Sequence, residues 1–577
     1  MDFNLVDEAW LPVVLNDGSM ARLSLREVLA RAHEVHALAL ETASQLPPVI
    51  RLLLAVLHRA LGGPTGDRQW REWWFAGRFD AEPVEAYLAE HRSRFNLFDP
   101  AVPFMQAGGL EALNGQTKTV ALIIPHVATG NNVPLFSGQR DARPEALDPA
   151  RAARWLLHTH AWDTAAIKTG AVGDPRARAG KTVGNPVGSL GQLGVAMPTG
   201  PSLWHTLMCN LLPVDAQTLA ADKPVWERAA LTARWDDAVL PSGPVSLFTW
   251  PSRRIRLLPE TDPASGQPVV RQVLVCAGDR LPLSSGHELR HWLQCEPHTA
   301  WKRSTNLERR HSFRPVYWPV RHAPDRQLWR GLGSLLARAE ALGAGPGNDA
   351  AALQGPRALA QLGSRGRRAL LRDVPVQVLA VGLEYGTQSS VVTEAYADTL
   401  PLPVALLSAE DRTWRDAVLE AVEATSRAVA TLAQLAHHLA VAAGCRPEEE
   451  GLLAGHRRRA REQAYAALDG QFRTWLATLQ PEEADPEPAQ DAWATTVRRI
   501  LHEHAADLLD GASPAAFRGR EITHGDSTQR YDAALAELTF RAALNKALAN
   551  LQQPDDTPPT TSSTDGQRQP ELESTAR

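Results

Sequence analysis

The residues that come closest to a known chemical motif lie at 179–182, where the chain reads Ala-Gly-Lys-Thr. A phosphate-binding loop ends in this way, but it needs another glycine five positions before Gly180, where this chain has Pro175. No apolar strand precedes the segment, so its backbone amides are not expected to form a phosphate nest. A nucleotide-dependent enzyme that uses Lys181 and Thr182 is therefore kept only as an alternative.

Other candidate catalytic or metal-binding patterns are weaker. The glycine-rich run at 188–194 lacks the strand–helix–strand context of a dinucleotide site. His437 and His438 are neighbours on a predicted helix and point to different faces, which is wrong for a shared metal. His524 and Asp526 fit a polar loop better than an acid–base pair. The cysteines form no Cys-x-x-Cys pair and are expected to be buried thiols: Cys209, Cys276, Cys295 and Cys445. The sequence thus predicts no enzyme, cofactor or metal site.

Two short loops remain that could bring backbone close to a ligand. Residues 168–174 combine small side chains with one cation, and such a loop can lie against base edges where a Cβ atom would clash. Residues 386–390 form a polar tip after a β-type run, and the glutamine there can bond to base edges or push between them. An ordinary surface turn and an ordinary hairpin tip explain the same spacings, so these alternatives stay open.

Charge and composition limit the classes of protein that the chain can form. A net charge of −5 argues against a protein that coats nucleic acid with its whole surface, although a local basic groove remains compatible. Residues 302–330 carry eight basic and two acidic side chains and include Phe313, Tyr317, Trp318 and Trp329. This segment fits a solvated face or a partner surface. Without a run of eighteen apolar residues or a secretion signal, a cytoplasmic protein that does not contact a membrane is expected.

The elements that must position these loops divide the chain in two. A length of 577 residues exceeds what one core supports, so two or more domains are expected. Residues 1–400 are interpreted as one mixed α/β body, in which Ser24 and Glu27 have the spacing of a capping box at a helix start. The body includes two β-type runs, at 269–275 and 376–381. It also includes two glycine-rich stretches, at 129–139 and 169–200, which are expected to be long loops.

From about residue 405 the pattern becomes helical. Apolar side chains recur at steps of three and four residues in four successive segments, which predicts four long amphipathic helices. Three breaks separate them: 444–455, 481–491 and 511–526. We therefore expect a four-helix bundle over 405–552 and a disordered tail at 553–577. The predicted fold class is α+β, a large mixed α/β N-terminal body followed by a C-terminal four-helix bundle.

Several segments resemble, in their order along the chain, the large subunit of the type I-E CRISPR surveillance complex Cascade. They are 4–13 (NLVDEAWLPV), 23–27 (LSLRE), 96–100 (NLFDP), 103–106 (PFMQ) and 165–175 (AAIKTGAVGDP). The predicted helical bundle also matches the domain plan of that family. The resemblance covers essentially the whole chain except the tail.

The resemblance implies a non-catalytic subunit that recognises the protospacer-adjacent motif (PAM) in double-stranded target DNA, largely from the minor groove, and starts strand separation. The glycine loop would place backbone against the PAM base pairs: Lys168, Thr169, Gly170, Ala171, Val172 and Gly173. The hairpin tip would be a wedge, with the glutamine between the first base pairs after the PAM: Thr387, Gln388, Ser389 and Ser390. A loop near the 5′ end of the guide RNA would contain Asn131, Asn132 and Phe136, with the phenylalanine as a stacking contact.

The implied partners are the guide RNA, the other Cascade subunits and a helicase-nuclease recruited in trans. The chain departs from the family pattern in two ways. Some members carry a cysteine cluster for zinc, which is missing here, so no metal is expected. The family's minor-groove lysine has no counterpart between Lys223 and Lys302, and Arg290 is the candidate substitute. A purely structural scaffold subunit is the remaining alternative.

Overall fold

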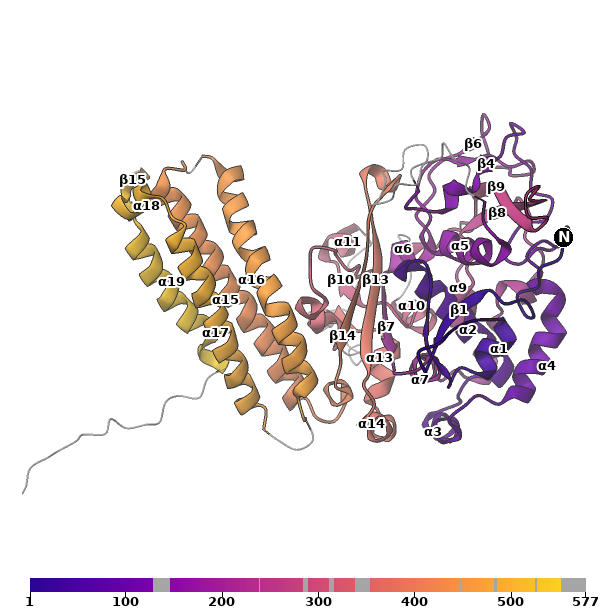
Figure 1. Ribbon diagram of the computed structural model, residues 1–577, viewed down its shortest axis with the longest axis horizontal. Coiled ribbons are helices and arrows are strands. Elements are labelled where there is room, and N and C mark those ends of the chain that lie inside the picture. The colour runs from indigo at the N-terminus through magenta and orange to yellow at the C-terminus, as the bar shows by residue number, and fades with distance from the viewer. Residues whose placement is uncertain are drawn as a thin grey trace, which may run out of the picture.

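The computed structural model describes nine stretches of the chain: 1–127, 146–237, 239–283, 289–310, 316–337, 353–446, 448–481, 485–524 and 527–551. Helices and strands mix up to Pro401, and long helices make up most of the chain beyond it (Figure 1). The predicted α+β fold class is therefore confirmed. No helix within these stretches has both the length and the apolar character needed to cross a membrane.

A small antiparallel sheet opens the chain, in the order β2–β1–β3. Its strands are β1 (Leu11–Leu15), β2 (Met20–Leu23) and β3 (Val35–Leu38). The predicted helix start is confirmed, because the Ser24 hydroxyl accepts a hydrogen bond from the Glu27 N–H and the Glu27 carboxylate accepts one from the Ser24 N–H at 2.8 Å. This capping box satisfies amides that no helical carbonyl reaches, so α1 begins directly after β2.

Three more sheets build the rest of the body. Their strands are β4 (Lys118–Thr119), β5 (Lys168–Thr169), β6 (Lys181–Thr182), β7 (Val195–Thr199), β8 (Arg253–Thr261), β9 (Pro268–Ala277), β10 (Trp301–Arg303), β11 (Tyr317–Pro319), β12 (Leu353–Gln354), β13 (Gln377–Tyr385) and β14 (Val392–Pro401). One sheet has the order β4–β9–β5–β6, with β8 also paired to β9. The others are β11–β10–β12 and β14–β13–β7. The long hairpin β13–β14 reaches the end of the body that holds β4 and β6 (Figure 1).

Helices pack around these sheets. Those of the body are α1 (Leu25–Ala30), α2 (Leu46–Leu61), α3 (Asp67–Ala76), α4 (Ala81–His91), α5 (Pro149–Trp162), α6 (Ser189–Leu193), α7 (Leu203–Asn210), α8 (Ala216–Ala221), α9 (Pro244–Phe248), α10 (Leu289–Cys295), α11 (Thr305–Arg310), α12 (Leu332–Leu335), α13 (Arg357–Ala360) and α14 (Arg365–Leu371). Helices α2 and α5 are buried along most of their length. Apolar side chains dominate α2, whereas α5 also buries polar side chains such as Arg154 and His158. Their burial fixes the position of the segment that leads into β5.

The stretch at 169–200 is more regular than predicted. The glycines predict a long loop, but the stretch contains β5, β6, α6 and β7. Strand β7 pairs with β13 over the whole of Val195–Thr199, and its side chains are almost all buried. The glycines around β7 favour the prediction of a loop. The strand forms by pairing with β13, which lies far away in the sequence and leaves no local pattern.

The C-terminal part is helical, as predicted. Its elements are α15 (Thr413–Ala443), α16 (Glu450–Thr478), α17 (Glu487–Asp510), α18 (Pro514–Arg518), β15 (Arg520–His524), β16 (Ser527–Tyr531) and α19 (Ala533–Leu548). The long helices lie side by side (Figure 1), and α15 contacts each of the other three. Helices α16 and α17 begin inside the predicted breaks. The unpredicted strand β15 lies in the third break, and its partner β16 follows that break.

Trp329 connects the two parts of the chain. Its ring is fully buried and stacks on Phe472 of α16 at a centroid distance of 4.5 Å. Its indole N–H donates to the Asp469 carboxylate at 3.0 Å. One buried apolar cluster runs from β1 to α19 through this contact region. The predicted division into separate domains at 400–405 stays a prediction, and the predicted tail at 553–577 lies outside the described residues.

Candidate nucleic-acid interface

The glycine loop at 168–174 is a tight turn at the end of β5. The Asp174 N–H donates to the Ala171 carbonyl oxygen at 3.2 Å, which closes a four-residue turn. Gly173 occupies the third position with φ +87°, a conformation that other L-residues adopt only with strain. The Thr182 hydroxyl on β6 donates to the Asp174 carboxylate at 2.9 Å. The turn is thus held in one conformation by its own backbone and by the neighbouring strand.

Gly170 has a different structural purpose from Gly173. It is buried, and a Cβ atom there would lie 2.9 Å from the Gly180 carbonyl carbon. Its N–H donates to the Gly180 carbonyl oxygen at 2.8 Å. Ala171 is buried as well, whereas Val172 is 50% exposed. Of the residues from Gly170 to Gly173, only the tip formed by Val172 and Gly173 faces solvent.

The exposed tip carries backbone groups that can bind a ligand. Within the described part of the chain, no group accepts from the Gly173 N–H, and none donates to the Val172 or Gly173 carbonyl oxygens. A backbone N–H matches the acceptors that every base pair shows in the minor groove, and a carbonyl oxygen matches the guanine amino group. The tip can therefore offer one donor and two acceptors to a minor groove.

Lys168 anchors the loop from inside. Its ammonium lies 2.6 Å from the Asp163 carboxylate, and the two side chains are only 7% and 12% exposed. Burial lowers the pKa of Lys168, and Asp163 offsets only part of this effect. Burial would raise the pKa of Asp163, but Lys168 and the buried Arg253 guanidinium outweigh it and hold that pKa below its usual value. In this conformation Lys168 is directed inward, so its predicted contact with DNA stays a prediction.

The predicted wedge lies at the tip of the β13–β14 hairpin. Thr387 and Gln388 are exposed, and the Ser390 hydroxyl donates to the Thr387 carbonyl oxygen at 2.8 Å. Gln388 (φ 55°, ψ 22°) and Ser389 (φ 53°) both have the left-handed conformation. For a residue with a Cβ atom this costs roughly 1–2 kcal/mol. A strained and well-defined backbone thus presents the Gln388 side chain to solvent.

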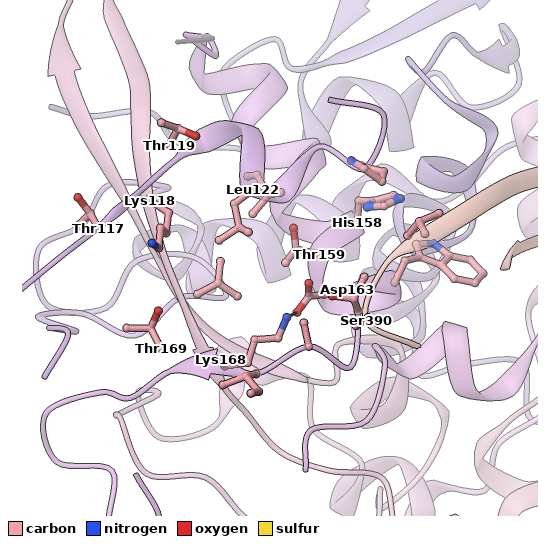
Figure 2. A pocket seen from close by; sticks show the side chains of 18 residues that line it. Thr117, Lys118, Thr119, Leu122, His158, Thr159, Asp163, Lys168, Thr169 and Ser390 are labelled. Carbon is pink, nitrogen blue, oxygen red and sulfur yellow. Dashed lines mark ion pairs between the residues drawn. The ribbon is translucent and has the colours of Figure 1, made fainter. Parts of the chain in front are cut away.

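One hydrogen bond joins the segment just before the glycine loop to the hairpin tip, although the two lie far apart in the sequence. The Ala165 N–H, three residues before β5, donates to the Ser389 carbonyl oxygen at 2.8 Å. A cavity of about 510 Å³ lies between the glycine-loop strand and the hairpin. Figure 2 shows Thr117, Lys118 and Thr119 on one side of this cavity and His158, Asp163 and Ser390 on the other. The fold therefore places the predicted recognition loop and the predicted wedge at one edge of the body.

The other predicted contacts lie at Arg290 and in the segment from Asn131 to Phe136. Arg290 is exposed on α10 and does not line the cavity, so its role as a substitute for the family's lysine stays a prediction. Asn131, Asn132 and Phe136 lie outside the described residues. Their predicted contact with the guide RNA also stays a prediction.

Three cations near the two loops were missed by sequence reasoning. Lys118 on β4 is exposed and lines the cavity. The guanidinium carbons of Arg176 and Arg280 lie 4.2 Å and 4.3 Å from the centre of the Trp235 ring. The proximity of Arg176 to the glycine loop could have been seen in the sequence. The fold alone brings Arg280 there, from the turn after β9.

The segment at 179–182 does not have the geometry of a phosphate-binding loop. The backbones of Arg178 and Lys181 exchange two hydrogen bonds, at 2.8 and 3.0 Å, around a two-residue turn. Ala179 (φ 47°) and Gly180 (φ 72°) both have positive φ, as a type I′ hairpin turn requires. Lys181 therefore lies on a β-strand and does not precede a helix N-terminus. The alternative of a nucleotide-dependent enzyme has no support in this geometry.

The described residues also contain no group of three or more His, Cys, Asp or Glu side chains that could hold a metal ion. Three of the cysteines are buried as predicted, but Cys445 is only half-buried. Burial raises the pKa of the Cys209 thiol to about 12, which keeps it protonated.

The chain is similar to known proteins over nearly its whole length. The model of the family described as CRISPR-associated protein Cse1 matches residues 4–503. The CRISPR-associated protein CasA/Cse1 of Thermus thermophilus is 30% identical over 530 residues, which cover 88% of this chain and 94% of that protein.

Solved structures show the same fold. Cse1 from Thermobifida fusca matches with a TM-score of 0.82 and 34% identity, covering 96% of this chain and 99% of that one. Cse1 from Acidimicrobium ferrooxidans matches with a TM-score of 0.79 and 29% identity, with the same coverage. A chain of a CRISPR RNA-guided surveillance complex shares the fold with a TM-score of 0.59 at 20% identity, covering 88% of this chain and 99% of that one.

Proposed function

The chain belongs to the family of the CRISPR-associated protein Cse1, the large subunit of type I-E Cascade, and we propose that it recognises the PAM in target duplex DNA and starts strand separation there. In this proposal it binds without catalysing a reaction. Its partners are the guide RNA, the other Cascade subunits and double-stranded target DNA. The assembled complex then recruits a helicase-nuclease.

The observation that carries the proposal is the hydrogen bond from the Ala165 N–H to the Ser389 carbonyl oxygen at 2.8 Å. It supports a fixed geometry between the tip at Val172 and Gly173 and the wedge at Gln388. A duplex whose minor groove contacts the tip would present its next base pairs to the glutamine. Readout through backbone groups distinguishes A·T from G·C pairs but not their orientation, so several related PAM sequences should be accepted.

The energetics of opening also favour a preformed wedge. Unstacking a base step costs a few kcal/mol, and the guide–target heteroduplex recovers this cost only after its first pairs have formed. The left-handed backbone at Gln388 is already present without DNA. The conformational cost of building the wedge is therefore met during folding and adds nothing to the barrier for opening.

Gly173 provides the direct test of PAM recognition. An alanine there would place a methyl group on the exposed tip, with open space up to a Cβ contact of 3.7 Å with Ala233. We expect Gly173→Ala to weaken PAM-dependent binding of the reconstituted complex by about tenfold or more, because one misfit at a base edge costs roughly 1–3 kcal/mol. Binding to a duplex without a PAM should not change.

Gly266→Ala is the matched control. Gly266 has φ +69°, so alanine carries a similar backbone strain, and no atom lies within 4 Å of its added Cβ. It lies in the β8–β9 connection, at the opposite end of β9 from the pairing of Thr169 with Cys276. If both variants bind the PAM duplex equally, the glycine loop does not read DNA. If the complex without this chain binds the same duplex equally well, the subunit is only a scaffold.

A further inference from the structure

A second cavity, of about 470 Å³, lies where the segment between β6 and α6 meets the turn after β9 and the end of β11. Trp318, Arg280 and Arg321 line it, together with residues of the segment between β6 and α6. These three side chains come from β11, from the turn after β9 and from the segment that follows β11. We call this cavity the tryptophan groove.

Trp318 is the exposed aromatic side chain of the groove. Its neighbour Pro319 is buried and Trp318 is 37% exposed, as the alternation along a strand requires. Strand β11 is an edge strand, and Trp318 pairs directly with Lys302 on β10. Directly paired residues lie on the same face of a sheet, so the exposed Lys302 stands beside the indole ring.

The charge around Trp318 is positive. Arg321 is exposed and has no ion pair or hydrogen bond within the described part of the chain. Arg280 donates to the Val183 carbonyl oxygen at 3.0 Å, and its buried Nε atom has no hydrogen-bond partner among the described residues. Of the described residues that line this cavity, only Asp237 is a carboxylate, and Arg176 pairs with it at 2.7 Å. An unneutralised positive field therefore remains at the aromatic ring.

Helix α6 contacts both the groove and the last residue of β13. A Cβ atom at Gly191 of this helix would lie 2.3 Å from the Tyr385 hydroxyl oxygen, and Tyr385 is the last residue of β13 before the hairpin tip. A Cβ atom at Gly194, directly after the helix, would lie 2.6 Å from the Val320 carbonyl oxygen, next to Arg321. One short helix thus contacts the base of the wedge on one side and the groove on the other.

We propose that the tryptophan groove binds the displaced DNA strand directly after the wedge, with one unpaired base stacked on Trp318 and phosphates held by Lys302, Arg280 and Arg321. Exposed aromatic rings flanked by cations are how proteins hold single strands without reading their sequence. The target strand finds a partner in the guide, whereas the displaced strand has none and needs a protein surface. This inference rests on the proposed function, because it requires the chain to open a duplex.

The first test compares two targets for the reconstituted complex. With a PAM-bearing duplex, Trp318→Ala should weaken stable binding by about 5- to 150-fold, the value of one base–aromatic stack. With the target strand alone, which has no displaced strand, it should bind like the parent. Trp318→Phe should retain most of the duplex binding. Phe75→Ala, an exposed aromatic on α3 outside the groove, should be neutral on both targets.

A second test locates the strand itself. A 5-iododeoxyuridine placed one to three positions past the PAM in the displaced strand should crosslink to Trp318 under ultraviolet light. Arg321→Gln with Lys302→Gln should reduce the slope of log affinity against log salt by about 1.4, since each phosphate contact contributes about 0.7 for a single strand.

Equal losses for Trp318→Ala on both targets, or a crosslink that maps outside the groove, would overturn the inference. The proposed function fails in a different way, since the parent complex itself would then show no PAM-dependent opening. If the parent opens the duplex and Trp318→Ala opens it equally well, only the groove assignment is wrong.

Discussion

Replacing Gln388 separates the wedge side chain from the backbone that presents it. In the structure Gln388 has φ 55° and ψ 22°, and its side chain is exposed at the hairpin tip. Gln388→Ala removes the side chain and keeps the left-handed strain. Gln388→Gly removes both the side chain and the strain. Gln388→Asn keeps the amide on a side chain one methylene shorter, and asparagine tolerates the left-handed conformation.

The expected changes in stability and in DNA opening have different signs. Relief of the left-handed strain should raise the free energy of unfolding by roughly 1–2 kcal/mol. The extra freedom of glycine in the unfolded chain should lower it by roughly 0.5–1 kcal/mol. The glycine variant should therefore be as stable as the parent or more stable by about 1 kcal/mol. Both Gln388→Ala and Gln388→Gly should open DNA about 10- to 100-fold more slowly, because the unstacked base step loses its replacement contact. Gln388→Asn should lie between them and the parent.

The assay uses the complete complex and a PAM-bearing duplex with 2-aminopurine at the first position after the PAM. Its fluorescence rises when the base unstacks, so a rapid-mixing experiment reports the opening rate. Urea unfolding of the variant chains gives their free energies of unfolding. If Gln388→Gly opens DNA at the parental rate, the side chain is not a wedge. If opening rates follow stability and not the side chain, backbone strain is the relevant quantity and the reasoning is refuted.

Two further predictions concern the buried groups beside the cavity. Asp163→Asn leaves the Lys168 ammonium buried without its anion. We expect a loss of about 3–5 kcal/mol in the free energy of unfolding, measured in urea. A loss below about 1 kcal/mol would show that the ion pair is not needed for stability. Burial lowers the pKa of His158 to about 3. Below about pH 6.5 the unfolded chain therefore takes up a proton on this histidine while the folded chain does not. The free energy of unfolding consequently decreases as the pH falls below about 6.5. Between pH 7 and pH 5, His158→Gln should lose about 2 kcal/mol less than the parent, and equal losses would contradict the assignment.

Local patterns in the sequence predicted the parts of the fold that depend on neighbouring residues. The capping box at Ser24 and Glu27 forms as its spacing indicates, because both partners lie within one helical turn. The periodic apolar residues after 405 gave the long helices, since each buries one face against the others. The beginnings of α16 and α17 were placed too late, because acidic and glycine residues near a helix start read as a break although they continue the helix.

The candidate site was found in part. Its two loops were identified from small and polar residues, and from a family resemblance that the comparisons confirm. The sequence could not show that Gly170 is buried and Gly173 exposed. Gly170 is buried by its contact with Gly180, which is set by the fold and not by neighbouring residues. It also predicted Lys168 as a contact to DNA but did not show that the fold pairs its ammonium with Asp163 in the interior.

The sequence by itself determined the family, the helical C-terminal part and the absence of a recognisable catalytic motif, because these follow from residue types and their local spacing. Only the tertiary structure decided that the Ala165 N–H meets the Ser389 carbonyl, and that Trp318, Arg280 and Arg321 line one groove. Such contacts join residues far apart in the sequence. Their geometry is set by the packing of α5, α6 and β13 in the core, which no local pattern records.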